Sequence, residues 1–441
     1  MLRITVCVLL GFALFIGFTA VNTPPAETVP APVMLDPATH VETGLGEHLT
    51  VKIAVIGTGD ELFFWWGHIA LIIENTLTGQ SHFFDYGVFS FAQENFFMNF
   101  AMGRLIYSVA VSPTASNIAN YRIDNRDVII YTLNIPPLKR ELIYRQAQTD
   151  VGTDYLYHHF RHNCVTPLLY LIDIATERQF SAQFANVDEP GRFTLRQHVR
   201  RHTWFSPFID WGLNFLMGQE IDREITPWEE MFLPSELARN IYNFEFYVEG
   251  ERQRLVSGRE EVFMSEGRPP VLDVPLTQWP RQLVFSLAVA LFLGFLFFIQ
   301  AKKSPAFGQV ALGICHSLFG LIFGGAGLML FFMANFTSHD YTFNNVNLFF
   351  ASPLLLLAVP LGIRYAFSDN YHKRLRPEFT LRLLWLLVVL GIFASMLVKL
   401  TPWFWQDNLT DQLLLLPIAL VLSLEPAGLR RMLRRIFWRW L

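Results

Sequence analysis

A cysteine at position 164 lies between a group of histidines and an apolar run with helical spacing, in the stretch YLYHHFRHNCVTPLLYLID at 155–173. Asn163 is a good N-cap residue, and Pro167 is tolerated in a first helical turn. We therefore expect Cys164 in the first turn of a helix, where the helix dipole favours a thiolate. A thiolate attacks carbonyl carbons. The alternative is that Cys164 is a small buried apolar residue, the commonest fate of a free cysteine.

A histidine and an aspartate lie upstream on two predicted strands. The segment WWGHIALII at 65–73 is followed by the turn ENTLTGQ and a second strand, SHFFDYGV, at 81–88. Folding this hairpin about Leu77 places His68 within cross-strand reach of Asp85. Such an Asp orients the His ring and stabilises the imidazolium. His82 is a weaker candidate for the role of Asp85. The alternatives are that His68 is a buried histidine whose hydrogen bonds are satisfied within the core, and that Asp85 is a turn residue.

Together these residues form a set suited to covalent acyl transfer. Cys164 would attack a carbonyl, His68 would take the thiol proton and return it to the leaving group, and Asp85 would hold the ring. The better oxyanion donor is the backbone N–H of Cys164, because Asn163 is more readily explained as a helix cap. Tyr155 either lines an acyl pocket or packs in the core.

The remaining histidines of this stretch do not suggest a metal site. His158, His159 and His162 lie close together, but no second cluster of carboxylates or histidines accompanies them. Structural zinc sites take four protein ligands and catalytic sites three, and histidines at i, i+1 and i+4 beside a thiol do not by themselves supply such a set. We therefore predict no metal and no cofactor.

The composition indicates a membrane protein with a large extramembrane domain. Of 441 residues 52% are hydrophobic, including 42 Phe and 11 Trp, and the excess is concentrated in apolar runs. Most of these approach the roughly 20 residues that a membrane-spanning helix needs. The runs cover residues 4–20, 282–300, 308–333, 348–366, 380–400 and 411–424. We therefore expect one globular domain followed by five membrane helices.

The distribution of basic residues predicts the orientation of these helices. Lysine and arginine follow the second, fourth and last runs, whereas the loops at 335–347 and 403–411 carry almost none. Because basic loops remain cytoplasmic, the globular domain is expected on the opposite, periplasmic side. The three cysteines are far apart and two lie in apolar runs, so no disulfide framework is implied. A net charge of −4 without a basic stripe gives no sign of nucleic-acid binding.

These observations divide the chain into six segments. The first run is either a signal anchor or a cleaved signal peptide, and a Pro-rich tether follows it. The predicted segments are 1–22 (signal), 23–47 (tether), 48–250 (thiol enzyme domain), 251–280 (linker), 281–428 (five-helix transmembrane domain) and 429–441 (basic cytoplasmic tail).

Several elements are expected inside the globular domain. Alternating β-rich segments predict strands at 48–57, 104–112 and 127–135, while helices are expected at 89–103 and 138–150. Residues 180–245 are expected to contain loops and short helices. Their apolar side chains form either core or a lipid-facing shelf: Trp204, Phe205, Trp211, Phe215 and Met217.

Four segments resemble a known family. WWGHIAL, FFDYGVFSF, FMNFAMGRLIYSV and YLYHHFRHNCVTPLLYLID resemble the N-terminal periplasmic domain of the Lnb-type bacterial lipoprotein N-acyltransferases. That domain is similar to permuted papain-like folds such as the NlpC-type peptidases and lecithin:retinol acyltransferase. The resemblance covers roughly 48–245 and continues in FTSHDYTFNNVNLFFASPL at 336–354. One departure is the pair His339–Asp340, where we would expect His-Pro.

The resemblance implies a fold and a reaction. The fold class is α+β, a permuted papain-like domain followed by an all-α transmembrane bundle. Cys164 would be the nucleophile, His68 the base and Asp85 a third member. An acyl chain would pass from a phospholipid donor to Cys164, and then to the N-terminal amine of a diacylated lipoprotein acceptor, at the bacterial inner membrane.

A polar loop in the membrane part is a second candidate binding site. Ser338, His339, Asn345 and Asn347 either are solvated or bind a phospholipid headgroup or the lipoprotein amine. Two other functions remain open for the whole chain. One is a hydrolase on the same fold, either a phospholipase or a peptidoglycan peptidase. The other is a non-enzymatic envelope sensor or scaffold.

Overall fold

The computed structural model describes residues 43–90, 94–302, 304–369, 371–401 and 404–424. The chain forms two compact units. Of the described residues, 43–207 and 224–275 belong to the sheet unit, and 208–223 and those from 276 to 424 belong to the membrane unit. The predicted signal segment at 1–22, most of the tether and the basic tail at 429–441 lie outside the described residues.

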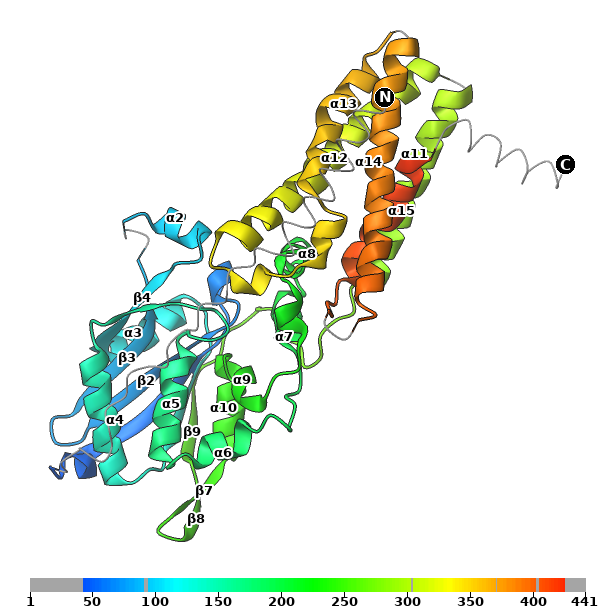
Figure 1. Ribbon diagram of the computed structural model, residues 1–441. Coiled ribbons are helices and arrows are strands. Elements are labelled where there is room, and N and C mark those ends of the chain that lie inside the picture. The colour runs from blue at the N-terminus through cyan, green and yellow to red at the C-terminus, as the bar shows by residue number, and fades with distance from the viewer. Residues whose placement is uncertain (1–42, 91–93, 303, 370, 402–403, 425–441) are drawn as a thin grey trace. The chain divides into compact units, whose positions relative to one another are not determined.

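A seven-stranded antiparallel sheet forms the centre of the sheet unit, with strand order β6-β4-β3-β2-β1-β5-β9 (Figure 1). A separate two-stranded ribbon pairs β7 with β8. The strands are β1 Leu49–Ile56, β2 His68–Asn75, β3 Gln80–Val88, β4 Ile106–Pro113, β5 Val128–Leu133, β6 Asp154–Leu156, β7 Glu245–Val248, β8 Glu251–Arg254 and β9 Val256–Phe263.

Short helices connect and cover these strands. Several begin as the sequence directs: Pro137 occupies the first turn of α4, and Thr194 and Thr226 form capping boxes at α7 and α9. The helices are α2 Phe96–Ala101, α3 Thr114–Ile123, α4 Pro137–Asp150, α5 Val165–Ala175, α6 Gln179–Phe184, α7 Leu195–Thr203, α9 Pro227–Glu230 and α10 Pro234–Asn243.

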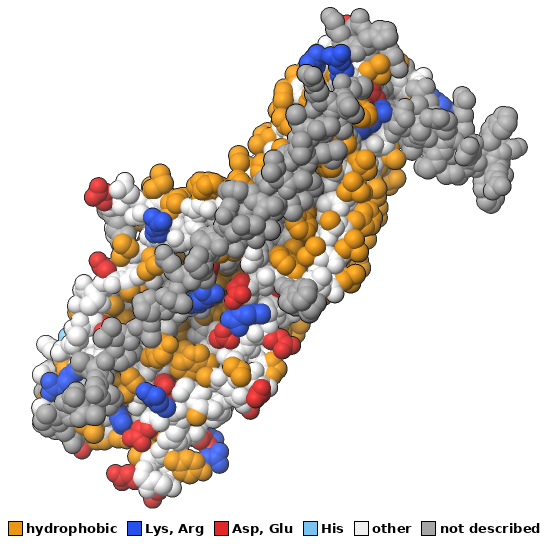
Figure 2. Space-filling view, viewed as in Figure 1, with side chains coloured by type: hydrophobic (Ala, Val, Ile, Leu, Met, Phe, Trp, Pro, Cys, Tyr) orange, Lys and Arg blue, Asp and Glu red, His pale blue; other side chains and the backbone are white. Residues whose placement is uncertain are grey.

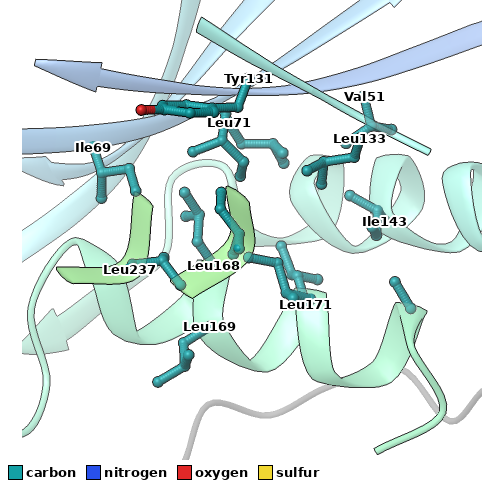
Figure 3. Close-up of a cluster of buried hydrophobic side chains, with 14 of the residues drawn as sticks. Val51, Ile69, Leu71, Tyr131, Leu133, Ile143, Leu168, Leu169, Leu171 and Leu237 are labelled. Carbon is teal, nitrogen blue, oxygen red and sulfur yellow. The ribbon is translucent and has the colours of Figure 1, made fainter. Parts of the chain in front are cut away.

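The strand β2 is buried on both faces. Ile69 and Leu71 pack with Leu168 and Leu171 of α5 in the larger core (Figure 3). Because strand side chains alternate, Ile72 points to the other face and joins a smaller cluster with residues of α3. Full burial of one such side chain stabilises the fold by roughly 1.5–3 kcal/mol. The strand that begins at His68 is therefore held rigidly.

The hairpin between β2 and β3 has the predicted position. Asn75 Oδ1 accepts hydrogen bonds from the N–H groups of Leu77 (2.9 Å) and Thr78 (3.3 Å), which closes the turn. Gly79 has φ +68°, in the left-handed region that glycine adopts readily. The strands then pair with Leu71 opposite Phe84 and Ile73 opposite His82. The prediction of a turn about Leu77 is confirmed.

Two predicted elements differ from the structure. Among the described residues, the helix expected at 89–103 covers only Phe96–Ala101. The predicted linker at 251–280 contains β8 and β9, and β9 pairs with β5 at the sheet edge. Glu260 and Glu261 on that edge strand are exposed, so the strand lacks the apolar alternation by which strands are recognised.

The membrane unit consists of apolar helices. Within the described residues, four segments are long and apolar enough to cross a membrane: Trp279–Lys302, Pro305–Phe336, Val346–Ala366 and Arg374–Val398. The last predicted run forms a shorter helix of 15 residues. The helices are α11 Trp279–Lys302, α12 Pro305–Phe336, α13 Ala358–Ala366, α14 Tyr371–Val398 and α15 Leu409–Ser423, and Figure 2 shows their hydrophobic surface. The order of an α+β domain followed by a helical region is confirmed.

Glycines bring α12 close to the segment that leads into α13. A Cβ at Gly320 would lie 2.6 Å from that of Ala358, and one at Gly327 would lie 2.0 Å from the Ala351 carbonyl oxygen. Small residues that permit such close approach are typical of membrane helix interfaces.

The helix α8 (Pro207–Leu216) packs within the membrane unit, although the sequence places it in the globular domain. Phe215 and Met217 are buried, and Trp211 packs against the same core. Of the two predicted alternatives, core or lipid-facing shelf, these three residues therefore follow the core alternative, in the core of the membrane unit. Trp204 and Phe205 belong to the sheet unit, where the Phe205 ring contacts Trp65.

Candidate active site

His68 is the first residue of β2 and lies opposite Ile56, the last residue of β1. Gly67 precedes it with φ +75°, and a Cβ at Gly67 would lie 2.8 Å from the Ile56 carbonyl oxygen. The chain therefore needs a glycine to enter β2 at this point. His68 begins a strand whose next residues are buried in the core, so the backbone position from which its side chain extends is fixed.

Asp85 lies on the adjacent strand and holds the His68 ring. The His68 Nε2 is 2.9 Å from Asp85 Oδ1, and their side chains are 14% and 19% exposed. The same oxygen accepts a hydrogen bond of 2.8 Å from the N–H of Gly87. A β-bulge between Asp85 and Val88 shifts the register here, as bulges beside active sites often do. Because Nε2 bonds to the carboxylate, Nδ1 is the nitrogen left for proton transfer.

Cys164 occupies the N-cap of α5, with a free thiol and intermediate exposure. The helix thus begins one residue later than predicted. Asn163 Oδ1 accepts a 2.9 Å hydrogen bond from the Val165 N–H, so Asn163 stabilises the helix start as expected of a cap. In the described part of the chain, no acceptor pairs with the N–H of Cys164. That N–H is available to an oxyanion.

Gly87 is the point where His68 and Cys164 approach each other. A Cβ placed on Gly87 would lie 2.7 Å from His68 Cε1, 3.4 Å from His68 Nδ1 and 3.3 Å from Cys164 Cβ. The Nδ1 edge of the ring and the cysteine side chain therefore face the same small space. The structure thus brings together His68, Asp85 and Cys164.

The charges of this group favour an imidazolium beside a carboxylate. Burial is the largest influence on the pKa of His68 and lowers it, but the charges of Asp85 and Cys164 outweigh burial and raise the pKa well above 6.5. For Asp85, burial is again the largest influence, and it raises the pKa. The charge and the hydrogen bond of His68 lower the pKa of Asp85, and the net result is a decrease. A histidine with a raised pKa accepts a thiol proton readily.

Arg126 is a further residue that affects this group, and no local sequence motif indicates it. Arg126 is buried, donates from Nε to the Gly57 carbonyl oxygen at 3.1 Å, and stacks over the rings of Phe64 and Tyr121 at 4.2 and 5.2 Å. Its charge contributes to the lowered pKa of Asp85. Its burial results from tertiary contacts, which no local motif indicates.

Two tyrosines lie beside the thiol. The Tyr155 hydroxyl donates to the backbone carbonyl of Tyr86, the residue before Gly87, and its ring packs on the core. Burial, and secondly the charge of Cys164, raise the pKa of both Tyr155 and Tyr107. Tyr155 was predicted to line a substrate pocket, and Tyr107 was not selected. The packing of the Tyr155 ring on the core agrees with the second sequence-based alternative, and a role in lining a pocket stays a prediction.

Asn163 and the histidines shape the turn that precedes the thiol. Asn163 Nδ2 donates to the carbonyl oxygens of His159 and Phe232, both at 2.8 Å. His158 and His162 exchange backbone hydrogen bonds of 2.8 and 2.9 Å. His159 is half-buried, and the loss of solvent around its ring lowers its pKa to about 3, so the ring is neutral. Within the described residues, no group of three or more His, Cys, Asp or Glu is arranged to hold a metal ion.

The other predicted binding residues lie in the membrane unit. The His339 Nδ1 hydrogen-bonds to the Tyr341 hydroxyl at 2.7 Å. Asn345 and Asn347 are buried and both donate to the Phe215 carbonyl oxygen at the end of α8, at 3.0 and 2.9 Å. Their amides thus fix the end of α8, and a role in binding substrate stays a prediction.

The same network includes the loop before α15. Gln406 Nε2 donates to Asn345 Oδ1 at 3.0 Å, and Asn408 Nδ2 donates to Asn347 Oδ1 at 2.7 Å. His82, the alternative to Asp85, lies opposite Ile73 on β2, five residues beyond His68, whereas Asp85 is the residue that bonds to the His68 ring.

Comparison with known proteins identifies both parts of the chain. Residues 46–201 match the family model described as the Lnb N-terminal periplasmic domain. Residues 277–422 match the model described as the Lnb transmembrane domain. No curated protein and no solved structure matches the chain. His68, Asp85 and Cys164 fall in the first match, and the polar loop at 336–354 falls in the second.

Proposed function

The chain belongs to the Lnb family, as a membrane-anchored protein with a periplasmic domain, and on this premise we propose that it is a lipoprotein N-acyltransferase. Its donor is a phospholipid, and its acceptor is the α-amino group of the diacylglyceryl-modified cysteine that begins a bacterial lipoprotein. The observation that carries the proposal is the approach of Cys164 to His68, whose Nε2 is held 2.9 Å from Asp85.

The first half-reaction forms a thioester. His68 Nδ1 takes the proton of the Cys164 thiol, and Sγ attacks the ester carbonyl carbon of the phospholipid. The N–H of Cys164 stabilises the oxyanion of the tetrahedral intermediate. When the ester C–O bond breaks, His68 returns the proton to the leaving oxygen. The products are acyl-Cys164 and a lysophospholipid.

The second half-reaction transfers the acyl chain to nitrogen. The lipoprotein amine attacks the thioester carbonyl, His68 takes a proton from the attacking nitrogen, and the Cys164 thiolate departs. An amide replaces a thioester, and the lipoprotein gains a third acyl chain. Asp85 stabilises the imidazolium in both halves, because its carboxylate is ionised and hydrogen-bonded to the ring.

The membrane helices support a lipid reaction over a soluble one. Both substrates are anchored in a bilayer, and four segments in the described part of this chain are long and apolar enough to cross one. An enzyme that cleaves a soluble or cell-wall substrate needs no more than one such anchor.

A reporter assay tests this function. A strain whose own lipoprotein N-acylation can be switched off would receive the wild-type chain, Cys164→Ser, or Cys315→Ser as the matched control. Cys315 is a second free cysteine, in α12 of the membrane unit. Mass spectrometry of the reporter's N-terminal peptide should show a third acyl chain with the wild type and Cys315→Ser, but not with Cys164→Ser.

Other outcomes would overturn the proposal in identifiable ways. A reporter that stays diacylated with well-expressed wild-type protein contradicts transferase activity. Release of free fatty acid or cleaved muropeptides that depends on Cys164 would instead assign a hydrolase. A third acyl chain that also appears with Cys164→Ser would contradict the role of Cys164 as nucleophile. Rescue of the strain's phenotype by Cys164→Ser without any N-acylation would assign a non-enzymatic role.

A further inference from the structure

We propose that the exposed apolar side chains of α2, and a row of aromatic rings behind them, bind the acyl chain that is transferred. This inference rests on the proposed function and names the part of the site that takes the donor's hydrocarbon. We call the α2 side chains Phe97, Met98 and Phe100 the outer surface, and the rings of Phe96, Phe89, Tyr107 and Tyr155 the aromatic row.

The outer surface is strongly apolar and strongly exposed. Phe97 is 77% exposed, Met98 63% and Phe100 56%. The nine residues from Asn95 to Gly103 contain no charged side chain. Single exposed apolar residues are ordinary in proteins, but adjacent ones on one helical turn mark a binding surface. The helix lies beyond the ends of β3 and β4, away from the helices that cover the sheet (Figure 1).

The aromatic row connects this surface to the thiol site. Phe96 contacts both Phe97 and Phe100, with ring centroids 5.5 and 6.5 Å away, and stacks on Phe89 at 6.2 Å. The edge of Phe89 meets Tyr107 at 5.1 Å. Each contact falls in the range in which aromatic rings pack. The rings thus form an unbroken sequence from the exposed helix inward.

The inner end of the row lies beside Cys164. The Tyr107 ring is 6.3 Å from that of Tyr155, whose hydroxyl donates to the carbonyl of Tyr86, next to Gly87. Gly87 is the residue that both His68 and Cys164 approach. The row therefore ends where the reacting carbonyl must lie.

The polarity of the row matches an acyl chain attached to an ester. Its outer members carry only hydrocarbon, whereas Tyr107 and Tyr155 at the inner end carry hydroxyl groups. An acyl ester has the same order, with methylenes at one end and a polar carbonyl at the other. A protein partner would be expected to use polar contacts around the apolar centre of its interface, and no charged residue lies between Asn95 and Gly103.

The test compares two donors with the full-length protein in lipid nanodiscs. The variant Phe97→Ser/Met98→Ser/Phe100→Ser removes the outer surface. The matched control replaces three apolar residues of the sheet unit, 66%, 82% and 85% exposed, which lie in the β2–β3 turn, at the end of α3 and in the loop after α6: Leu77→Ser, Ile123→Ser and Val187→Ser. Intact-mass spectrometry follows acylation of Cys164 by a dipalmitoyl phospholipid and by p-nitrophenyl acetate.

The outer-surface variant should acylate about tenfold more slowly from the phospholipid, since a loss of that size is typical of removing buried apolar contacts. Its rate with the acetyl donor should stay within about twofold of wild type, because the thiol and His68 are unchanged. The control triple variant should alter neither rate. Equal losses with both donors, or no loss with either, would overturn the inference.

A second measurement does not depend on turnover. A phospholipid with a diazirine at the end of its acyl chain would be photolysed with the Cys164→Ser protein, and the labelled peptides mapped. Labelling of the peptide that spans 95–103 is expected. Labelling confined to other parts of the chain would overturn the inference. If wild type forms no acyl-Cys164 with either donor, the proposed function fails, and this labelling still decides whether α2 binds an acyl chain.

Discussion

Addition of one methyl group at Gly87 is expected to disable the site while the domain stays folded. The new Cβ would lie 2.7 Å from His68 Cε1 and 3.3 Å from Cys164 Cβ. The backbone of Gly87 is not in the left-handed region, so alanine meets no conformational penalty there. The effect of Gly87→Ala is therefore purely steric: the added methyl group lies between Cys164 and His68.

The size of the effect follows from these distances. Ordinary contact begins at 3.4 Å, so the His68 edge must retreat by about 0.7 Å. The ring cannot retreat without straining its 2.9 Å bond to Asp85 or leaving the thiol. A misplacement of about 1 Å in a catalytic group costs roughly 10²-fold in rate. Overpacking of this kind costs about 1–3 kcal/mol of stability, which a typical domain tolerates.

The assay measures the rate at which Cys164 is acylated, together with the thermal unfolding temperature. Gly87→Ala should lose about 100-fold in rate, because the His68 ring is displaced from the thiol, and should remain folded. The matched control is Gly258→Ala in β9, where a Cβ would meet Thr132 at an ordinary 3.8 Å. It should acylate like wild type. A folded Gly87→Ala protein that acylates at the wild-type rate would refute the placement of His68 and Cys164 around this glycine.

Two further predictions concern the ion pair and the amide network. Asp85→Asn should lower the free energy of unfolding by about 1.5–3 kcal/mol, the range for hydrogen bonds to charged groups. Because the pKa of His68 is raised in the folded state, its contribution to stability is fully present below pH 6.5 and is lost as the pH rises through the folded pKa. Because the pKa of Asp85 is lowered in the folded state, its contribution to stability is fully present above pH 3.8. The difference from wild type should thus be greatest between these values and shrink at higher pH, as measured by chemical denaturation. Asn347→Ala removes hydrogen bonds to the Phe215 carbonyl, the Asp411 carboxylate and the Asn408 amide. It should lower the free energy of unfolding by about 1–3 kcal/mol for each buried partner that loses its hydrogen bond, which would be measured as a lower unfolding temperature in detergent.

Each of these predictions has a contradicting outcome. A stability difference for Asp85→Asn that grows above pH 6.5 would mean that His68 is not the charged partner. For Asn347 the matched control is Asn335→Ala, whose amide donates only to the Phe331 carbonyl in its own helix. If both asparagine variants unfold alike, the network does not hold α8.

Local sequence signals predicted the hairpin and the helix that carry His68, Asp85 and Cys164. The Asn75–Gly79 turn sets the register of β2 and β3, and this register brings His68 to Asp85. Asn163 is a cap residue, and its side chain does stabilise the start of the helix at Cys164. The turn was predicted correctly and the helix start to within one residue, because turns and caps depend on a few adjacent residues.

Features that depend on distant contacts were not predictable. The strand β9 is charged and exposed, and only its pairing with β5 makes it a strand. Arg126 is buried by Phe64 and Tyr121, which nothing in its own neighbourhood indicates. The role of Gly87 was missed although its motif was noticed, because a glycine's function here is the space it leaves.

Interception of the acyl-enzyme tests the central claim most directly. Wild-type protein mixed with a phospholipid of defined acyl chain, without acceptor, should gain the mass of that chain on the Cys164 peptide. Hydroxylamine should remove it, as it cleaves a thioester. Addition of a diacylated lipoprotein peptide should instead move the same chain to the peptide amine. A peptide that becomes N-acylated while Cys164 never carries the chain, or that does so with Cys164→Ser, would contradict the account.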